Sequence, residues 1–257
     1  MPTLRDVSEG FGADAQRYHR ARPDYPAGLV QRVVANSPGK EVLDVGIGTG
    51  IAAALFRQAG CTVLGVEPDE RMAALAREAG QEVELARFED WNPAGRTFGA
   101  VIAAQAWHWV DMTAGAVKAA EALAPDGLLA IFWNSFLPPA QVNEAIAAVY
   151  RKALPDMPLL GSGGMPGPDG YRTLCDRAAQ GMAAAGSFGE PEHWRFDWER
   201  SYTTAEWLDV VPTFGGWSRT PADKQEEILA GMAAAVDDFG GTFTMGYATV
   251  AVAASRM

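Results

Sequence analysis

One short stretch of the chain places three glycines at alternate positions, directly after an apolar run that carries a single carboxylate: Leu43-Asp44-Val45-Gly46-Ile47-Gly48-Thr49-Gly50. The apolar run predicts a buried strand, and the residues from Ile51 onward predict a helix. Glycine adopts backbone conformations closed to other residues and lets a ligand approach the main chain. The first turn of a helix adds free N–H groups aimed at that ligand. The stretch therefore indicates a binding site for a nucleotide-like ligand.

The spacing of the glycines distinguishes among nucleotide sites. Gly46, Gly48 and Gly50 form G-x-G-x-G, whereas a dinucleotide fingerprint is G-x-G-x-x-G and a phosphate-binding P-loop needs a lysine after its last glycine. This spacing argues against a nucleotide-dependent oxidoreductase. The carboxylate of Asp44 suits a ligand with ammonium or hydroxyl donors better than it suits a pyrophosphate.

Two further groups of residues follow predicted strands. Glu67 ends the second strand about 20 residues beyond the loop, where an acidic side chain can accept hydrogen bonds from both ribose hydroxyls. Gln105-Ala106-Trp107-His108-Trp109 lies at the carboxyl end of the fourth strand, the rim where open α/β sheets bind ligands. His108 is the best-placed general base in the chain, or else it orients the rim loop.

The stretch 43–50 matches the first motif of the class I S-adenosylmethionine-dependent methyltransferases, and the chain resembles that family here. The resemblance implies a methyltransferase that uses S-adenosylmethionine. Three alternatives remain open. Phe88 either stacks on the adenine or belongs to the core, and either Glu89 or Asp90 contacts the adenine amino group. Trp107 and Trp109 either form the wall of the methyl-transfer site or pack under a cap. The cofactor-binding residues that it implies in this part of the chain are Asp44, Gly46, Gly48, Gly50, Glu67, Pro68, Met72, Phe88, Glu89, Gln105 and Trp107.

A second resemblance lies near the N-terminus. The run Tyr18-His19-Arg20-Ala21-Arg22-Pro23-Asp24-Tyr25-Pro26 is similar to a segment of the small-molecule branch that includes the trans-aconitate and ubiquinone-type methyltransferases. It implies that Arg22 pairs with the cofactor carboxylate and that Tyr18 and His19 hydrogen-bond nearby. The alternative is a surface helix with solvated charges.

The second half of the chain is aromatic and less specific. Its glycine- and proline-rich loop at 155–170 is expected to be a lid. We expect aromatic residues to wall a pocket for a small apolar or aromatic acceptor, although the same residues could be core. The expected pocket residues are Trp109, Trp133, Phe136, Tyr171, Trp207, Phe214 and Trp217.

Apolar strands alternating with amphipathic helices position these groups. We predict strands at 41–45, 62–67, 82–88, 98–105, 128–133, 193–199 and 243–252. They predict an α/β, Rossmann-like, doubly wound and mostly parallel seven-stranded sheet whose last strand is antiparallel, with a small helical cap. We expect a single methyltransferase domain over 1–257, with cofactor-covering helices at 1–36, a cofactor-binding core at 37–134, and cap insertions at 135–188 and 203–238.

Composition narrows the function classes. The 257 residues carry a formal net charge of −11, which disfavours nucleic acids and anionic membranes as partners. The two cysteines stand in unrelated contexts, so we expect no disulfide framework and no metal site. The N-terminal residues lack the apolar segment of a signal peptide, and a cytoplasmic monomer or homodimer is expected. The alternative function is an S-adenosylmethionine-binding sensor or scaffold without turnover.

Overall fold

The computed structural model describes residues 11–155 and 168–257, which fall into two compact units. The first unit contains the described residues up to Arg22, together with those of Ser135–Gly170 and of Asp197–Ala248. The second unit contains Pro23–Asn134, Tyr171–Phe196 and Thr249–Met257.

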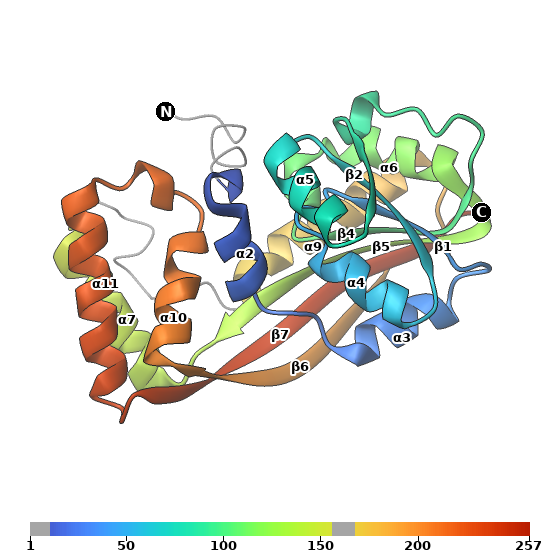
Figure 1. Cartoon of the computed structure of the whole chain (residues 1–257). Helices are drawn as coiled ribbons and strands as arrows, with labels where there is room; N and C mark the ends of the chain where they lie inside the picture. Colours follow the sequence, from blue (N-terminus) through green and yellow to red (C-terminus); the bar gives the residue numbers. More distant parts are fainter. Residues whose placement is uncertain (1–10, 156–167) are drawn as a thin grey trace. The chain divides into compact units, whose positions relative to one another are not determined.

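The described residues form one seven-stranded sheet in the order β3-β2-β1-β4-β5-β7-β6 (Figure 1). The pairs β1–β2, β2–β3, β1–β4 and β4–β5 are parallel, and the last strand is antiparallel, so the predicted fold class is confirmed. The edge strands are β3, which is short, and β6, in which charged and aromatic residues alternate. The strands are β1 (Glu41–Val45), β2 (Thr62–Glu67), β3 (Glu82–Leu85), β4 (Phe98–Ala104), β5 (Leu123–Leu137), β6 (Glu192–Thr203) and β7 (Thr242–Ser255).

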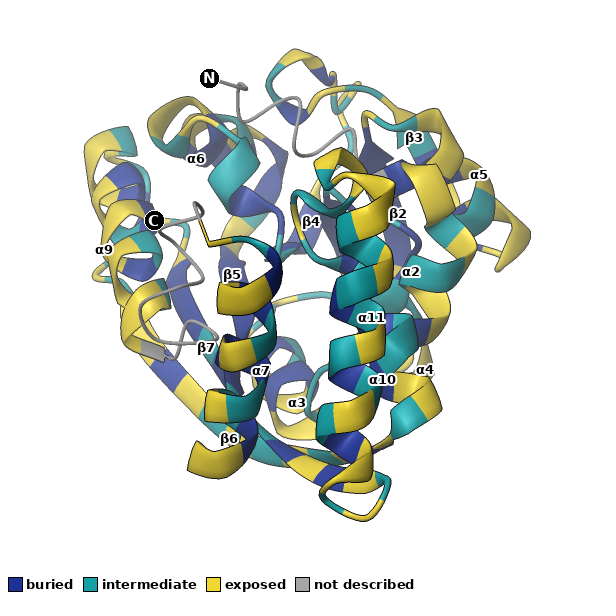
Figure 2. Ribbon diagram, turned by 90° about the vertical axis from the view of Figure 1, so that its left-hand side faces the viewer, coloured by how far each residue is buried: buried dark blue, intermediate teal, exposed yellow. Residues whose placement is uncertain are grey.

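Helices cover both faces of the sheet in the second unit. Alternate residues of β1 point to opposite faces: Leu43 packs in the cluster that includes α6 and α9, and Val42 packs in the cluster that includes α3, α4 and α5. Figure 2 shows the outer sides of α5 and α9 as exposed and the strands β2 and β4 as mostly buried. The helices are α3 (Ala27–Ala35), α4 (Ile51–Gln58), α5 (Glu70–Glu78), α6 (Met112–Ala122) and α9 (Pro168–Ala185), with short 3-10 turns η2 (Phe88–Asp90) and η3 (Trp107–Trp109).

The first unit is built from helices around an aromatic core. Trp207, Tyr202 and Tyr247 are fully buried in it, and the two tyrosine hydroxyls lie 2.6 Å apart in a hydrogen bond. A capping box starts α10, since Thr203 and Glu206 exchange side-chain to backbone bonds there. The elements are η1 (Phe11–Asp14), α2 (Ala15–Ala21), α7 (Ala140–Ala153), α10 (Thr204–Val210), η4 (Val211–Thr213), η5 (Trp217–Arg219) and α11 (Ala222–Asp237).

Some predicted boundaries differ from the structure. Strand β3 ends at Leu85 rather than Phe88, because Phe88 turns into the core as part of η2. Strand β4 ends before Gln105, whose φ of +57° is incompatible with a strand. Strand β5 begins at Leu123 rather than Leu128, with a register shift against Phe98 and Ala100 that accommodates the left-handed Asp126.

The expected cap over 135–188 stays a prediction, and its described residues fall in both units. Helix α9 from Tyr171 onward groups with the second unit, because its residues Ala178 and Met182 are fully buried in the core shared with α6. The expected lid falls largely on 156–167, outside the described residues. None of the described helices combines the length and the apolarity that crossing a bilayer requires.

Strand β1 occupies the point where the strand order reverses, since the chain proceeds from β1 to β2 and β3 on one side and to β4 and β5 on the other. Asp44 of β1 lies opposite Ile102 of β4, so the carboxyl ends of these two strands are neighbours. Open α/β sheets bind their ligands at this topological switch point.

Candidate active site

The loop after β1 is a tight turn made by its glycines. Gly46, Gly48 and Gly50 all have positive φ, at +67°, +58° and +88°. A Cβ on Gly46 would lie 2.6 Å from the Cβ of Ala106, so this glycine is also required by packing. A Cβ on Gly48 would lie 3.7 Å from Met72 Cε, an ordinary van der Waals contact, so the middle of the turn is less crowded than Gly46.

Glu67 is fixed against this loop. Its Oε2 accepts a hydrogen bond from the Gly48 N–H at 2.9 Å and its Oε1 accepts one from the Asp69 N–H at 2.9 Å. The residue is 7% exposed, and this burial raises the pKa of the carboxyl group. Each oxygen keeps a second lone-pair direction, so the carboxylate can still accept from two ligand hydroxyls.

Asp44 is the most unusual polar residue of the loop. It is fully buried, and neither carboxylate oxygen has a hydrogen-bond partner among the described residues. Burial raises the pKa of this carboxyl group well above its usual value, and the charge of Glu67 raises it further. A buried carboxylate without donors is unfavourable unless a ligand supplies them. An ammonium group with several N–H donors meets that need, so the residues of the loop fit the aminocarboxypropyl group of S-adenosylmethionine.

The rim at the end of β4 is held in a strained conformation. Gln105 has a φ of +57°, which costs a non-glycine residue about 1–3 kcal/mol. Its main-chain N–H donates to the Phe132 carbonyl at 2.9 Å, and its Nε2 donates to the Asn134 carbonyl at 3.0 Å. The strained backbone and the fixed amide together give this rim a defined shape beside the glycine loop.

Asn134 and Thr249 are buried polar residues that the sequence analysis missed. The Thr249 hydroxyl donates to Asn134 Oδ1 at 2.6 Å, and Asn134 Nδ2 donates to the Asp24 carbonyl at 2.9 Å. This network fixes β5 around Asn134, whose carbonyl in turn holds Gln105. The available signal was an asparagine inside an apolar strand, since buried polar groups are retained with partners.

His108 has a defined tautomer. Its Nδ1 accepts a hydrogen bond from the indole N–H of Trp133 at 3.2 Å, so the proton of the neutral ring is on Nε2. Burial lowers the pKa of the imidazole to about 4. The ring also lies 4.4 Å from the ring of Trp109. The unprotonated nitrogen, Nδ1, already accepts the bond from Trp133, and Nε2 carries the proton and is a hydrogen-bond donor. The catalytic assignment of His108 stays a prediction.

The aromatic residues expected beside the cofactor are core residues in the structure. Trp107 is fully buried and Phe88 is 4% exposed, with ring centres 6.1 Å apart. The indole Nε1 of Trp107 has no hydrogen-bond partner among the described residues. Both side chains are packed in the core, as the alternative interpretation expected. Their contact with the cofactor stays a prediction.

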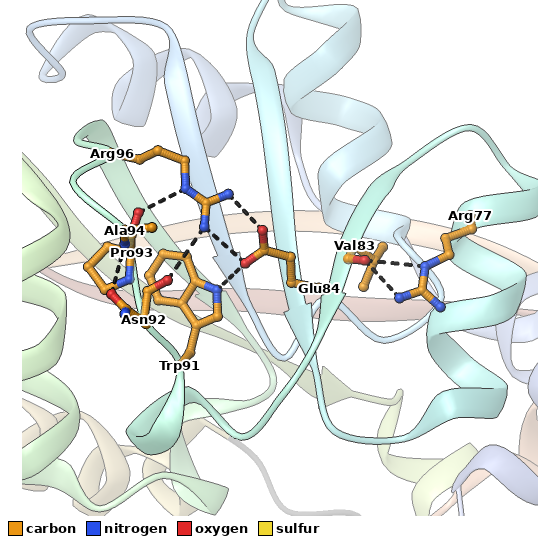
Figure 3. Close-up of polar contacts among 8 residues, drawn as sticks. All are labelled: Arg77, Val83, Glu84, Trp91, Asn92, Pro93, Ala94 and Arg96. Atoms are coloured by element: carbon orange, nitrogen blue, oxygen red, sulfur yellow. Dashed lines mark hydrogen bonds and ion pairs between the residues drawn. The ribbon is translucent and has the colours of Figure 1, made fainter.

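The segment after β3 is held by a clamp that consists of Glu84, Trp91 and Arg96. Glu84 accepts the indole N–H of Trp91 and a bidentate pair from Arg96, with Nη1 to Oε1 at 2.7 Å (Figure 3). Glu89 lies within the segment that the clamp closes and accepts from the Asp111 N–H at 3.3 Å. The predicted adenine-side residue therefore stands on a fixed turn.

The remaining predicted cofactor residues are distributed over both units. Met72 is buried beneath the loop and Pro68 is exposed, both in the second unit. Tyr18, His19 and Arg22 belong to the first unit. Their expected contacts with the cofactor stay predictions.

Arg22 has partners within the first unit. Its Nη2 donates to the Thr213 carbonyl, and its guanidinium carbon lies 5.0 Å from the ring centre of Tyr18 and 5.4 Å from that of Phe214. Its Nε is buried with no hydrogen-bond partner among the described residues. Arg22 is therefore not the fully solvated charge of the alternative interpretation.

The seven expected pocket residues separate into three groups. Trp133 and Trp207 are fully buried, and Phe136 is 5% exposed, so these three are core residues. Tyr171 packs against the core of the second unit, and Trp109 lies on the rim against His108. Phe214 and Trp217 line a cavity of about 190 Å³ inside the first unit. No cluster of three or more metal-ligating side chains occurs within residues 11–155 and 168–257.

Comparisons with known proteins show which proteins this chain resembles. Residues 18–144 match the family described as "Methyltransferase domain". An uncharacterized methyltransferase of Mycobacterium tuberculosis is 35% identical over 133 residues, which are 51% of this chain and 54% of that protein. A probable S-adenosylmethionine-dependent methyltransferase of Saccharomyces cerevisiae is 27% identical over 164 residues, 59% of this chain and 55% of that protein. The chain thus spans about half the length of the curated relatives that it matches.

A solved structure shows the same fold over nearly the whole chain. The putative type II methyltransferase from Anaeromyxobacter dehalogenans superposes with a TM-score of 0.66 at 23% identity, covering 91% of this chain and 97% of that one. The likeness extends past residue 144, so the second half of this chain shares that fold as well.

Proposed function

We propose that this chain is a class I S-adenosylmethionine-dependent methyltransferase and that it transfers a methyl group from S-adenosylmethionine to a small-molecule acceptor; the match of residues 18–144 to the methyltransferase family supports this. The observation that carries the proposal is the buried carboxylate of Asp44, which has no donor among the described residues and lies in the strand that leads into the glycine turn. A ligand with an ammonium group supplies those donors.

The residues of the second unit have separate tasks in this proposal. Asp44 binds the ammonium group of the cofactor, and Glu67, fixed by Gly48 and Asp69, accepts from the two ribose hydroxyls. When bound, S-adenosylmethionine supplies a methyl group made electrophilic by its sulfonium. The protein contributes alignment and exclusion of water, which suffice when the acceptor is already a nucleophile. His108, with its proton on Nε2, orients an acceptor oxygen as a donor rather than removing a proton.

Calorimetry tests the cofactor. We expect S-adenosylhomocysteine to bind and NAD not to bind. Glu67→Gln is expected to weaken S-adenosylhomocysteine binding at least tenfold, or about 1.4 kcal/mol, because it removes the charge that strengthens the ribose hydrogen bonds. Glu78→Gln, an exposed position on α5, is the matched control and is expected to bind like the unmodified protein. Tight binding of NAD alone would contradict the proposal.

Turnover is tested separately. We expect S-adenosylhomocysteine to be released when S-adenosylmethionine is supplied with a panel of small carboxylic acids, phenols and amines. Cofactor binding without release for any acceptor would support the sensor or scaffold alternative over transfer.

A further inference from the structure

Three successive buried residues of β5, Phe132, Trp133 and Asn134, hold the rim that follows β4. The carbonyl of Phe132 accepts a hydrogen bond from the main-chain N–H of Gln105 at 2.9 Å, directly after the last paired residue of β4. On the opposite face of the strand, the indole of Trp133 donates to Nδ1 of His108 at 3.2 Å. One short stretch of β5 therefore holds the rim at two places.

The side chain of Gln105 continues the contact with β5 where the main-chain ladder ends. At a φ of +57° the backbone of Gln105 turns out of the strand, and the pairing of β4 with β5 stops at Phe132. The Nε2 of Gln105 then donates to the carbonyl of Asn134 at 3.0 Å. The position of that carbonyl thus decides where the amide of Gln105 can bond and helps to maintain its strained backbone.

Asn134 is itself fixed from two directions. It is 1% exposed, and the fully buried Thr249 of β7 donates its hydroxyl to Oδ1 at 2.6 Å. Its Nδ2 donates to the carbonyl of Asp24 at 2.9 Å, and the neighbouring ring of Tyr25 makes a T-shaped contact with Phe132, with ring centres 5.0 Å apart. The stretch of β5 that holds the rim is therefore held in turn by β7 and by the segment before α3.

The rim packs against the glycine turn. A Cβ on Gly46 would lie 2.6 Å from the Cβ of Ala106, so a displaced rim changes the space beside the turn. The turn has separate support from β2, because the N–H of Gly46 donates to the Val66 carbonyl at 2.8 Å and that of Gly48 donates to Glu67 at 2.9 Å. Loosening the rim is therefore expected to disturb the alignment of the reactants more than it weakens cofactor binding.

We propose that Asn134 and Thr249 are positioning residues, whose buried hydrogen bond holds the rim Gln105–Trp109 in the conformation that methyl transfer requires. Both act through the carbonyl of Asn134 on Gln105, so neither side chain has to touch the cofactor or the acceptor. The link to methyl transfer rests on the proposed function, whereas the effect on the rim does not. A displacement of about 1 Å at a reacting centre can cost on the order of 10²-fold in rate, so the loss of one distant hydroxyl is measurable.

Kinetics of matched threonine variants test this role. Thr249→Val removes the hydroxyl and keeps the shape of the side chain, and we expect kcat to fall at least about tenfold while the dissociation constant of S-adenosylhomocysteine changes less than about threefold. Thr249→Ser keeps the hydroxyl and is expected to retain at least about half of kcat. Thr244→Val is the control, because Thr244 is an exposed residue of the same strand that bonds to Ser201 at 3.0 Å, and both quantities are expected to stay unchanged.

A double variant separates positioning from stability. Thr249→Val removes the donor to the buried Oδ1 of Asn134 and is expected to lower Tm, whereas the further change Asn134→Leu removes that acceptor as well. We expect Thr249→Val/Asn134→Leu to unfold at a higher temperature than Thr249→Val alone and to keep the loss of kcat. Recovery of kcat together with Tm would show that the pair only stabilises the fold, and it would overturn the proposal.

Amide hydrogen exchange gives a measurement that needs no turnover. We expect the amides of the rim Gln105–Trp109 to exchange faster in Thr249→Val, and those of the turn Gly46–Gly50 to exchange as in the unmodified protein. Unchanged exchange at the rim, or a loss of cofactor affinity as large as the loss of kcat, would overturn the proposal. If the unmodified protein transfers no methyl group to any acceptor while the rim responds to Thr249→Val, the proposed function fails and the positioning of the rim stands.

Discussion

The indole N–H of Trp133 donates to Nδ1 of His108 across 3.2 Å, and this bond fixes the proton of the imidazole on Nε2. His108 lies in η3, shortly after β4, and Trp133 lies within β5, the parallel neighbour of β4. The most conspicuous histidine of the sequence is thereby a neutral donor at physiological pH, since burial lowers its pKa to about 4.

Replacing His108 by asparagine tests this role. Asparagine keeps an acceptor near the Nδ1 position, and we expect kcat/KM for a carboxylate acceptor to fall by no more than about tenfold, whereas loss of a general base costs about 10²–10⁴-fold. The pH profile of the unmodified enzyme is expected to show no ionisation of His108 between pH 5 and 8. A profile with a pKa near 6.5 that disappears in His108→Asn would show that the residue is a base.

The same histidine affects stability in acid. Its folded pKa of about 4 lies below the ordinary value of 6.5, so between these values the unfolded chain binds a proton that the folded protein does not. Its contribution to the free energy of unfolding is present above pH 6.5 and is lost as the pH falls toward 4. In urea unfolding, the loss of stability from pH 7 to pH 5 is expected to be about 2 kcal/mol smaller for His108→Asn. An equal loss of stability in the two proteins would show that the imidazole of His108 is exposed to solvent.

Asp44→Asn is expected to stabilise the ligand-free protein while it weakens cofactor binding. The substitution removes a buried charge without donors, which we expect to raise the free energy of unfolding by about 1–3 kcal/mol. The pKa of Asp44 is raised in the folded protein, so its protonated form adds to the free energy of unfolding at low pH. That contribution is lost as the pH rises through the folded pKa. The gain in the free energy of unfolding from asparagine is therefore larger at pH 8 than at pH 5. Denaturant unfolding at both pH values, with Glu78→Gln as control, measures this; a destabilised variant would mean that Asp44 has donors of its own.

Gly46→Ala separates conformational strain from steric conflict when it is compared with Gly95→Ala. Both glycines have positive φ, +67° and +81°, but a Cβ on Gly95 would meet nothing within 4 Å. We expect Gly95→Ala to cost about 1–2 kcal/mol through strain, and Gly46→Ala to cost more and to abolish cofactor binding. Thermal unfolding and calorimetry give both quantities. Equal costs for the two variants would contradict the contact with Ala106.

Arg96→Met tests the clamp at Glu84. The pair is partly exposed, so global stability is expected to fall by about 1 kcal/mol or less. The amides of Phe88–Trp91 are expected to exchange with solvent faster, and the KM for S-adenosylmethionine to rise several-fold with little change in kcat. Arg77→Met is the control, because Arg77 bonds only to the Val83 carbonyl among the contacts drawn in Figure 3. A similar rise in KM for both variants would show that the clamp does not position Glu89.

The parts of the molecule that sequence reasoning predicted well depend on local chemistry. The turn at Gly46–Gly50 is defined by residues within a few positions of each other. The position of the Glu67 carboxyl group follows from its place at the end of an apolar strand. In each case the residue type and the spacing limit the backbone to one conformation.

The parts that could not be predicted depend on contacts between distant residues. Asn134 meets Thr249 across 115 positions, and Trp133 meets His108 across 25. The aromatic residues of the second half illustrate the same limit. Trp207 and Trp217 are ten positions apart, yet one is fully buried and the other lines a cavity, and only tertiary packing separates them.

The two edges of the sheet have a consequence for the behaviour of the protein at high concentration. β3 is only four residues long, and β6 alternates charged with aromatic side chains, with Arg32 stacked 4.3 Å from the ring of Trp194. Short or charged edge strands are poor templates for strand pairing between molecules. Both edges of this sheet therefore oppose intermolecular aggregation, although the strands between them are almost entirely apolar.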